Sequence, residues 1–240
     1  MSNQLLLRRR SRMNIDRDRF LMFTAQEDGS TIALDKQGNP PAHDFEFSLD
    51  GIIFVPYTVG SVITLDTDES VWFRKNGAQI NTLNVTDNPN IYYKFVATGS
   101  LVGNGKLTAL LGWWVNGYVG TWLNNNCFRY LLNTTSIVSP LCLPETIKRL
   151  NDFAFDYCSS LIGELDLRNV TIVGNGCFRD TKFDTVYVNN NLTSIGQTYN
   201  GLTTISNMFY YGTIQDFVTN YPTKYRCLVA KKYNAYILST

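Results

Sequence analysis

Short apolar runs alternate with turn residues through the first half of the chain, a pattern typical of β-strands. In residues 45–49 apolar and polar side chains alternate with a period of two, so one face of this strand should be buried. Asp50-Gly51 separates two apolar runs and is the clearest hairpin turn. Because strands do not alternate with helices, a nucleotide-binding α/β domain is disfavoured. The expected strands are Phe20–Thr24, Thr31–Leu34, Phe45–Leu49, Ile52–Val55, Val62–Leu65, Val71–Arg74 and Tyr92–Ala97.

The second half carries a repeat in which a small or sulfur-containing residue precedes Phe. The spacings between successive Phe residues are 27, 23 and 31, in the range of solenoid repeats with insertions. Each unit should supply one strand, one buried Phe and one turn, and should stack on its neighbours. The four pairs are Cys127-Phe128, Ala154-Phe155, Cys177-Phe178 and Met208-Phe209, and the strand pieces that follow them are Ile137-Val138, Leu165–Leu167, Val186–Val188 and Ile214–Phe217.

These patterns predict a mainly β protein in four parts. Residues 1–19 form a basic N-terminal arm, and residues 20–111 form an antiparallel, immunoglobulin-like β-sandwich. Residues 112–126 form an aromatic junction, and residues 127–240 form a short, irregular repeat solenoid. The C-terminal segment, with Cys227–Ala230 and Tyr236–Leu238, should cap the open end of the solenoid.

The junction contains a cluster of aromatic side chains that is a candidate ligand-binding site. Stacked indoles can hold the apolar face of a sugar ring, and aromatic residues are common binding anchors. The competing interpretation is that these rings fill the seam between two domains. The residues are Trp113, Trp114, Tyr118 and Trp122.

Composition and charge fit a folded chain with a distinct first segment. Of 240 residues, 44% are apolar and 17% are charged, which excludes a disordered chain. The arm carries six Arg against two Asp, a balance of +4, while the other residues hold 15 basic and 18 acidic side chains. No run of about 18 apolar residues occurs, so no membrane insertion is expected.

Three interpretations of the arm stay open. It is a disordered tail that aids solubility, an extended peptide that docks on a neighbouring subunit, or a contact for nucleic acid. The last is disfavoured because no aromatic residues interleave with the arginines, so no nucleic-acid partner is expected. The candidate docking residues are Leu5, Leu6, Leu7, Arg8, Arg9 and Arg10.

The sequence contains few residues that could form a catalytic site or bind a cofactor. His43 is the single histidine and lies in a Pro/Asp turn region, where a solvated or structural role is expected. The five cysteines include no C-x-x-C pair and are expected to be buried free thiols, so neither a metal nor another cofactor is predicted. The carboxylate pairs Glu164/Asp166 and Asp152/Asp156 are the residual enzymatic option, and a solvated repeat surface explains them more simply. We therefore expect a protein that is not an enzyme.

Residues 143–167 resemble the BspA-type leucine-rich repeat, whose form is "lp..v..I...aF..C.sL..i.lp". The matching pieces are Leu143–Leu150 and Ala154–Leu161, and the likeness extends more loosely over 125–142 and 170–188. The first half is similar to the β-domain that often precedes such repeats in proteins of gut anaerobes and their bacteriophages. It is carried by Leu21–Ala25, Phe45–Gly51, Val71–Arg74, Tyr93–Gly99 and Gly103–Leu111.

The resemblance implies display and adhesion and no particular chemistry. Cellular members of this group are usually exported, whereas Leu5–Leu7 precede the arginines here and no signal peptide is expected. The first hypothesis is therefore a structural component of a bacteriophage virion, made in the host cytoplasm: a fibre, decoration or tail-associated protein. It would dock through its arm on other virion proteins, or on further copies of itself. The alternative is a bacterial cell-surface adhesin that binds a host protein or glycan.

Overall fold

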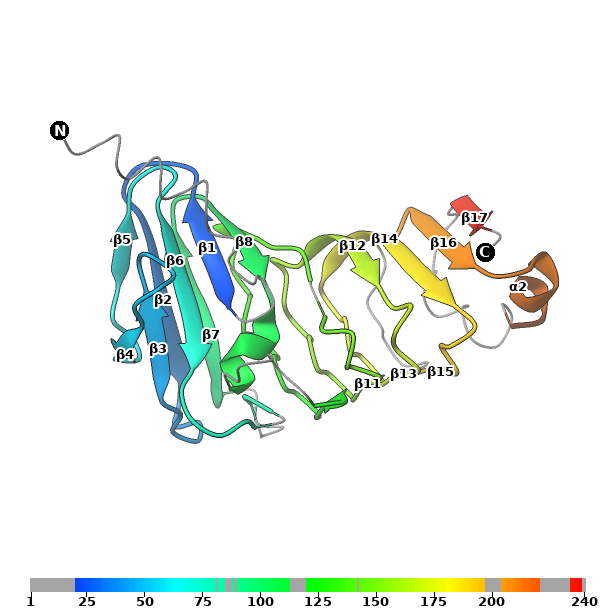
Figure 1. The fold of residues 1–240 in the computed structure, drawn as a ribbon, viewed down its shortest axis with the longest axis horizontal. Helices are drawn as coiled ribbons and strands as arrows, with labels where there is room; N and C mark the ends of the chain where they lie inside the picture. Colours follow the sequence, from blue (N-terminus) through cyan, green and yellow to red (C-terminus); the bar gives the residue numbers. More distant parts are fainter. Residues whose placement is uncertain are drawn as a thin grey trace.

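The computed structural model describes residues 20–80, 82–84, 88, 90–112, 120–141, 143–196, 204–220 and 234–238. Figure 1 shows an elongated molecule with a β-rich unit at one end, here called the β-unit (residues 20–112). Successive turns of chain follow it along the long axis and are here called the repeat stack. Among the described residues, no helix has both the length and the apolar character needed to cross a membrane.

The β-unit is built from two sheets. The larger sheet has the order β10 (Ile137–Val138), β8 (Leu101–Gly105), β1 (Leu21–Ala25), β6 (Ser70–Lys75), β3 (Phe45–Ser48) and β4 (Val55–Tyr57). The smaller sheet has the order β5 (Ile63–Leu65), β2 (Ser30–Gln37) and β7 (Tyr92–Thr98). All pairs are antiparallel except β8–β10, and the buried 3₁₀ helix η1 (Leu107–Leu111) closes the unit.

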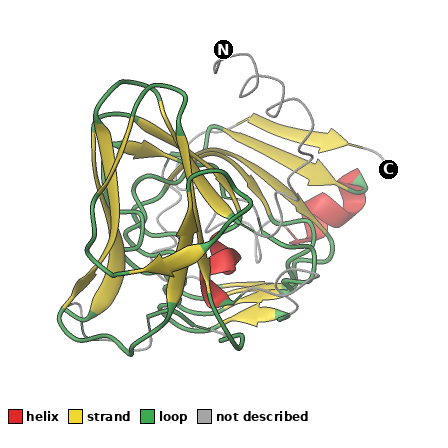
Figure 2. Cartoon of the chain, turned by 60° about the vertical axis from the view of Figure 1, so that its left-hand side comes forward, coloured by secondary structure: helices red, strands yellow, loops and turns green. Residues whose placement is uncertain are grey.

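Figure 2 shows the strands of the β-unit as a cartoon, and aromatic side chains make contacts between its two sheets. Phe23 and Phe73 of the larger sheet both contact Phe95 of the smaller one, with ring centroids 4.8 Å and 5.3 Å apart in edge-to-face arrangements. All three are buried, as expected where alternate residues of each strand point inward. The hydroxyl of Tyr57 accepts a hydrogen bond from the Leu34 amide, which ties β4 to β2 across the core.

The repeat stack has two parallel sheets on opposite sides of its core (Figure 1). One consists of two-residue strands in the order β15 (Ser194–Ile195), β13 (Ile172–Val173), β11 (Arg149–Leu150) and β9 (Trp122–Leu123). The other, here called the display sheet, has the order β12 (Ile162–Asp166), β14 (Lys182–Asn189), β16 (Asn207–Tyr211) and β17 (Asn234–Leu238). A short helix, α2 (Ile214–Asn220), follows β16.

Adjacent turns of the stack are offset by 22 or 23 residues where the register is most regular. Arg149 pairs with Ile172, and Ile172 pairs with Ser194. Between the two sheets, backbone hydrogen bonds continue from turn to turn: the Phe128 amide donates to the Ala154 carbonyl and the Phe155 amide to the Cys177 carbonyl, both at 2.8 Å. The backbone amides of one turn are thus satisfied by the next turn, which is the requirement for burying a loop-rich chain.

The turns around each Phe share one unusual backbone shape. Residues two positions before and two positions after the Phe have positive φ, although five of the six are not glycine. Such conformations are uncommon for residues with a Cβ, so the hydrogen bonds between turns must offset their strain. The six residues are Asn126, Phe153, Gly176, Tyr130, Tyr157 and Asp180.

The β-unit covers the first turn of the repeat stack and joins it without a break. Strand β10 belongs to the stack by sequence but pairs with β8, and an isolated bridge between Ser139 and Leu161 continues the sheet to β12. The Phe95 amide donates to the Leu131 carbonyl at 2.7 Å. Solenoid ends need a cap because their last turn would otherwise expose its core. The β-unit supplies that cap.

Most of the predicted strands are confirmed, and the mainly β class with a repeat region is shown. The strand predicted at Ile52–Val55 is wrong in its first part. Asp50 accepts hydrogen bonds from the amides of Ile52 and Ile53 at 2.8 Å, which folds this stretch into a turn, and pairing begins at Val55. Asp50-Gly51 accordingly lies in a six-residue loop between β3 and β4 and not in a tight hairpin.

The strand predicted at Ile214–Phe217 is also wrong, because this segment is the first part of α2. Thr213 accepts a hydrogen bond from the Asp216 amide and donates one to the Asp216 carboxylate. This Thr-x-x-Asp arrangement is an N-terminal helix cap. The immunoglobulin-like character of the β-unit stays a prediction.

Candidate functional site

Phe128, Phe155 and Phe178 form a stacked ladder in the interior of the repeat stack. All three side chains are fully buried. Ring centroids are 5.5 Å apart between Phe128 and Phe155 and 5.6 Å apart between Phe155 and Phe178. Each turn thus places one ring on the ring of the previous turn, and the ladder is a structural spine with no surface open to a ligand.

Met208-Phe209 is not a fourth step of this ladder, contrary to the sequence prediction. Both residues lie in β16, where Met208 pairs with Val186 and Phe209 pairs with Tyr187. Met208 is buried and Phe209 points outward. The spacing of 31 from Phe178 exceeds the turn length by eight residues, so this pair occupies the strand that follows the ladder position.

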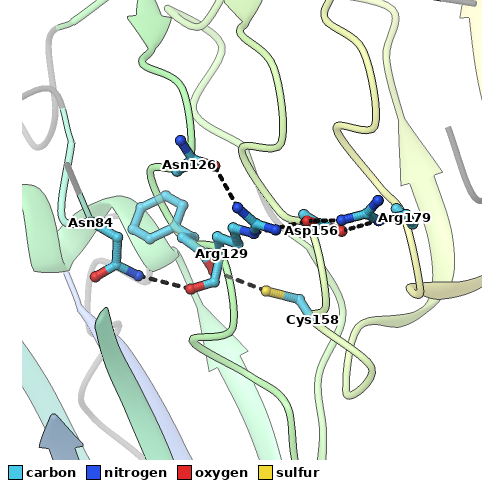
Figure 3. A network of polar contacts seen from close by, with 7 residues as sticks. Asn84, Asn126, Arg129, Asp156, Cys158 and Arg179 are labelled. Carbon is cyan, nitrogen blue, oxygen red and sulfur yellow. Dashed lines mark hydrogen bonds and ion pairs between the residues drawn. The ribbon is translucent and has the colours of Figure 1, made fainter. Parts of the chain in front are cut away.

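A buried carboxylate links adjacent turns beside the ladder (Figure 3). Arg179 donates from Nε and Nη2 to the two oxygens of Asp156, each at 2.7 Å, and Arg129 Nε lies 2.9 Å from Oδ2. Burial raises the pKa of Asp156, and the hydrogen bonds from Arg179 and the charges of both arginines oppose this shift. Asp156 therefore fixes the register of three successive turns, and its carboxylate is fully engaged.

The junction between β-unit and repeat stack depends on one buried amide. Asn84 Nδ2 donates to the Arg129 carbonyl at 2.8 Å, while its Oδ1 accepts from the Tyr93 amide at 2.9 Å. The backbone amide of Asn84 donates to the Cys127 carbonyl. One side chain therefore connects β7 to the first ladder turn, and the two parts of the chain share one continuous core.

The outward face of the display sheet is the candidate binding site. Tyr187, Phe209 and Tyr236 are register partners on β14, β16 and β17 and form one row across the sheet, here called the aromatic row. Their neighbours along the strands, such as Val186 and Met208, are buried beneath the sheet. Tyr236 remains 43% exposed. Three large rings in line on an accessible sheet face are typical of an interaction surface.

The rings of the aromatic row stack on one another and so turn their edges outward. The Tyr187–Phe209 centroids are 5.1 Å apart at 19°, and the Phe209–Tyr236 centroids are 4.8 Å apart at 15°. A sugar ring stacks on an aromatic face, whereas these faces are occupied by neighbouring rings along the row. Ring edges carry partial positive charge and suit the carbonyl and carboxylate oxygens of a protein partner.

Charged side chains border the row on the β12 side. The Tyr187 hydroxyl donates to Glu164 Oε1 at 2.9 Å, and this hydrogen bond raises the pKa of Tyr187. Arg168 Nη2 lies 2.6 Å from Asp166 Oδ2, and its guanidinium lies 5.6 Å from the centre of the Tyr187 ring. Glu164 and Asp166, which sequence analysis considered as a carboxylate pair, thus support the aromatic row.

The structure tests only part of the site predicted from sequence. Trp122 lies on β9, about half exposed, in register with Arg149 and on the side of the stack opposite the display sheet. The other three aromatic residues of the junction (Trp113, Trp114 and Tyr118) and the arm residues from Leu5 to Arg10 lie outside the described residues.

The histidine and the described cysteines, the other residues considered for catalysis or metal binding, lie in packed surroundings. His43 is partly buried between the Phe45 and Tyr93 rings, and burial lowers its pKa. Cys127, Cys158 and Cys177 are buried free thiols, as predicted, while the other two cysteines lie outside the described residues. Within the described ranges, no group of three or more His, Cys, Asp or Glu side chains is arranged to hold a metal ion.

Sequence analysis missed the aromatic row, although a signal for it was present. Residues 186–189 and 207–211 both alternate between buried and less buried positions, and Tyr187 and Phe209 occupy less buried ones. The Phe in the second segment was assigned to the ladder because it follows a sulfur-containing residue. Because Met208-Phe209 resembles the residue pairs of the ladder, the alternation with a period of two in residues 207–211, which indicates a strand, was overlooked.

Comparison with known proteins identifies the second half of the chain. Residues 121–221 match the family described as BspA type leucine rich repeat region, in six copies. The match starts directly before β9, within the stretch predicted to be a junction, and leaves the β-unit outside. No curated protein and no solved structure matches the chain. Residues 121–221 of this chain are thus similar to the BspA-type leucine-rich repeat region.

Proposed function

We propose that the chain is a non-enzymatic structural and binding component of a bacteriophage virion, a fibre, decoration or tail-associated protein. In this proposal the arm attaches the chain to the particle, and the display sheet contacts a protein on the host surface. The observation that carries the binding role is the aromatic row with its border of charged residues. A row of ring edges beside Glu164, Asp166 and Arg168 combines apolar area with directional polar groups, as binding hot spots do.

The absence of catalysis is part of the proposal and is supported by the state of the carboxylates. The Asp156 carboxylate is held by two arginines, Asp166 by Arg168, and Glu164 by the Tyr187 hydroxyl. Glycoside hydrolysis needs two carboxyl groups that face a substrate bond with separate protonation states. These three carboxylates serve structural contacts or border the binding face.

The particle context is supported by two features of the sequence. The arm joins three leucines to a run of arginines, a composition suited to docking on a neighbouring subunit. The β-unit is similar to the domain that precedes BspA-type repeats in proteins of gut anaerobes and their phages. Its place in the structure as the cap of the first repeat turn fits a single rigid module that can project from a particle.

Particle incorporation tests this proposal and separates the roles of arm and display sheet. Particles would be assembled with the full chain, with a chain lacking residues 1–19, and with the double variant Tyr187→Ser/Phe209→Ser. We expect the deletion to abolish incorporation. We expect the double variant to be incorporated normally but to reduce adsorption of the particles to host cells.

A matched control is Val96→Ser on β7, which changes a side chain as exposed as Tyr236 at a site remote from the row. Normal incorporation of the chain lacking residues 1–19 would contradict attachment through the arm. Unchanged adsorption of the double variant would contradict the binding role of the row. Recovery of the natural protein in the cell envelope of a bacterium, and its absence from particles, would favour the adhesin alternative.

A further inference from the structure

The loop between β3 and β4 exposes an unusual concentration of large apolar side chains. Leu49, Ile52, Ile53 and Val55 are 60%, 61%, 67% and 43% exposed, and all four fall within seven successive residues. Single exposed apolar residues need no explanation, but a contiguous group of this kind marks a surface that another chain covers. We refer to these four residues as the loop patch.

Hydrogen bonds from backbone amides of the loop to the side chains of Asp50 and Ser48 fix the conformation that exposes the loop patch. The Asp50 carboxylate accepts hydrogen bonds from the Ile52 and Ile53 amides, and Ser48 Oγ accepts from the Gly51 amide at 2.9 Å. Gly51 has φ +70°, the left-handed conformation that glycine adopts at least cost. The turn therefore presents two isoleucines to solvent in a fixed arrangement, which reduces the entropy lost on docking.

The loop patch lies where the basic arm joins the β-unit. Phe54 directly follows Ile53 and is partly buried: its ring lies 4.9 Å from the Phe20 ring and 3.9 Å from the Arg74 guanidinium. Phe20 is the residue that directly follows the arm. The arm of each copy thus begins beside the loop patch of that copy, and an arm exchanged between two copies would bring the two patches close together.

Charge favours contact between the arm and the β-unit. Residues 1–19 carry six Arg and two Asp, a balance of +4, whereas residues 20–112 carry five basic and ten acidic side chains, a balance of −5. The display end is different, since residues 113–240 carry ten basic and eight acidic side chains. Electrostatic attraction therefore directs the arm to a β-unit and away from the repeat stack.

We propose that Leu5–Leu7 of one copy pack on the loop patch of a second copy, with the exchange reciprocated. Exchange between copies is favoured over return to the same patch because of the charge between Leu7 and Phe20. This connecting segment holds all six arginines, and like charges resist closure into a compact loop. The twelve residues between Leu7 and Phe20 reach at most about 40 Å when extended, which sets the largest distance between the start of one β-unit and the loop patch that its arm contacts. The inference rests on the docking role of the arm proposed above and names the surface that receives it.

Sedimentation velocity of the full chain tests the exchange. We expect a dimer that weakens as salt is raised, because the arm contributes charge as well as apolar contact. Ile53→Asp and Leu6→Asp should each weaken self-association at least about tenfold, since each removes an apolar anchor and introduces a desolvated charge. Ile53 is 67% exposed, so folding of the Ile53→Asp variant should survive, and circular dichroism checks that both variants fold. The control Val96→Asp alters an exposed residue of β7 in the same unit and should leave the dimer unchanged.

A disulfide experiment decides which copy receives the arm. Leu6→Cys and Ile53→Cys would be made on separate chains of different length, both with Cys142 and Cys227 replaced by Ser, mixed and oxidised. A mixed disulfide between the two chains is expected. A monomeric wild-type chain, or an intrachain disulfide as the main product when both cysteines are on one chain, would overturn the inference. Normal dimerisation without particle incorporation would leave the exchange standing and contradict only the proposed function.

Discussion

Replacing Phe155 by alanine should unfold this protein under much milder conditions, because Phe155 is the central step of the ladder. Its side chain is fully buried and is stacked on both sides, at 5.5 Å from Phe128 and 5.6 Å from Phe178. Truncating a buried Phe to Ala costs about 3–5 kcal/mol, and aromatic pairs add about 0.5–1.5 kcal/mol each beyond burial. We expect a loss of about 4–5 kcal/mol, a large share of the roughly 5–15 kcal/mol that stabilises a typical domain.

Phe209→Ala is the matched comparison. The same substitution is made in a residue of the same type, but Phe209 lies on the outward face of β16 and stacks at the surface between Tyr187 and Tyr236. Only the partial burial and the pair contacts are lost, so we expect about 1–1.5 kcal/mol. Phe155→Leu, which keeps an apolar side chain in the core, should fall between the two at about 1.5–2 kcal/mol.

Urea unfolding followed by circular dichroism gives these differences from the shift of the midpoint at constant slope. The Phe155→Ala loss corresponds to about 10–15 °C in the melting temperature of a chain of this size. Equal losses for Phe155→Ala and Phe209→Ala would refute the assignment of ladder and row. A loss below about 2 kcal/mol for Phe155→Ala would show that the ladder is not a spine of the fold.

Three further predictions concern buried polar and thiol groups. Asn84→Ala should cost about 2–3 kcal/mol in urea unfolding, because it strands a buried amide and a buried carbonyl at the junction; a loss no larger than that of Val96→Ser would contradict this. Cys127 and Cys158 should react with iodoacetamide only after denaturation, since burial raises the pKa of each thiol to about 12; rapid alkylation of the native protein at pH 8 would disagree. Burial also raises the pKa of Tyr57 to about 12, whereas an unfolded tyrosine titrates near about 10. The stability that Tyr57 contributes is complete below pH 10 and lost as the pH rises toward 12, so Tyr57→Phe should show a smaller alkaline decrease in the urea midpoint than wild type.

The sequence was informative where side-chain periodicity and burial coincide. Strands β6 and β7 were predicted from short apolar and aromatic runs between turn residues, and both are confirmed, with buried and less buried residues alternating along them. The buried Phe128, Phe155 and Phe178 were recognised because each turn repeats both the aromatic residue and the small residue before it. When each turn contributes the same kind of core residue, these residues recur at regular spacing in the sequence and can be recognised without an alignment.

The errors arose where local hydrogen bonds decide the conformation. The apolar residues at 52 and 53 suggested a strand, but one Asp50 side chain captures their amides. Apolar residues at 214 and 217 suggested another strand, and the Thr213 cap makes them helical. The aromatic row could not be deduced from residue types alone, because its existence depends on which residues are in register across three parallel strands.

The regular offset between turns determines how the display sheet can change during evolution. Tyr187 and Phe209 are neighbours in space because 22 residues separate them in sequence, one turn of the stack. Duplication of one such segment would add a strand to each sheet, a ring to the ladder and a position to the row, lengthening the module by about 4.8 Å. An insertion of an odd number of residues within a strand would reverse which of the following side chains face outward. The length of the repeat stack therefore changes by whole turns, whereas the residues of the aromatic row can be substituted one at a time.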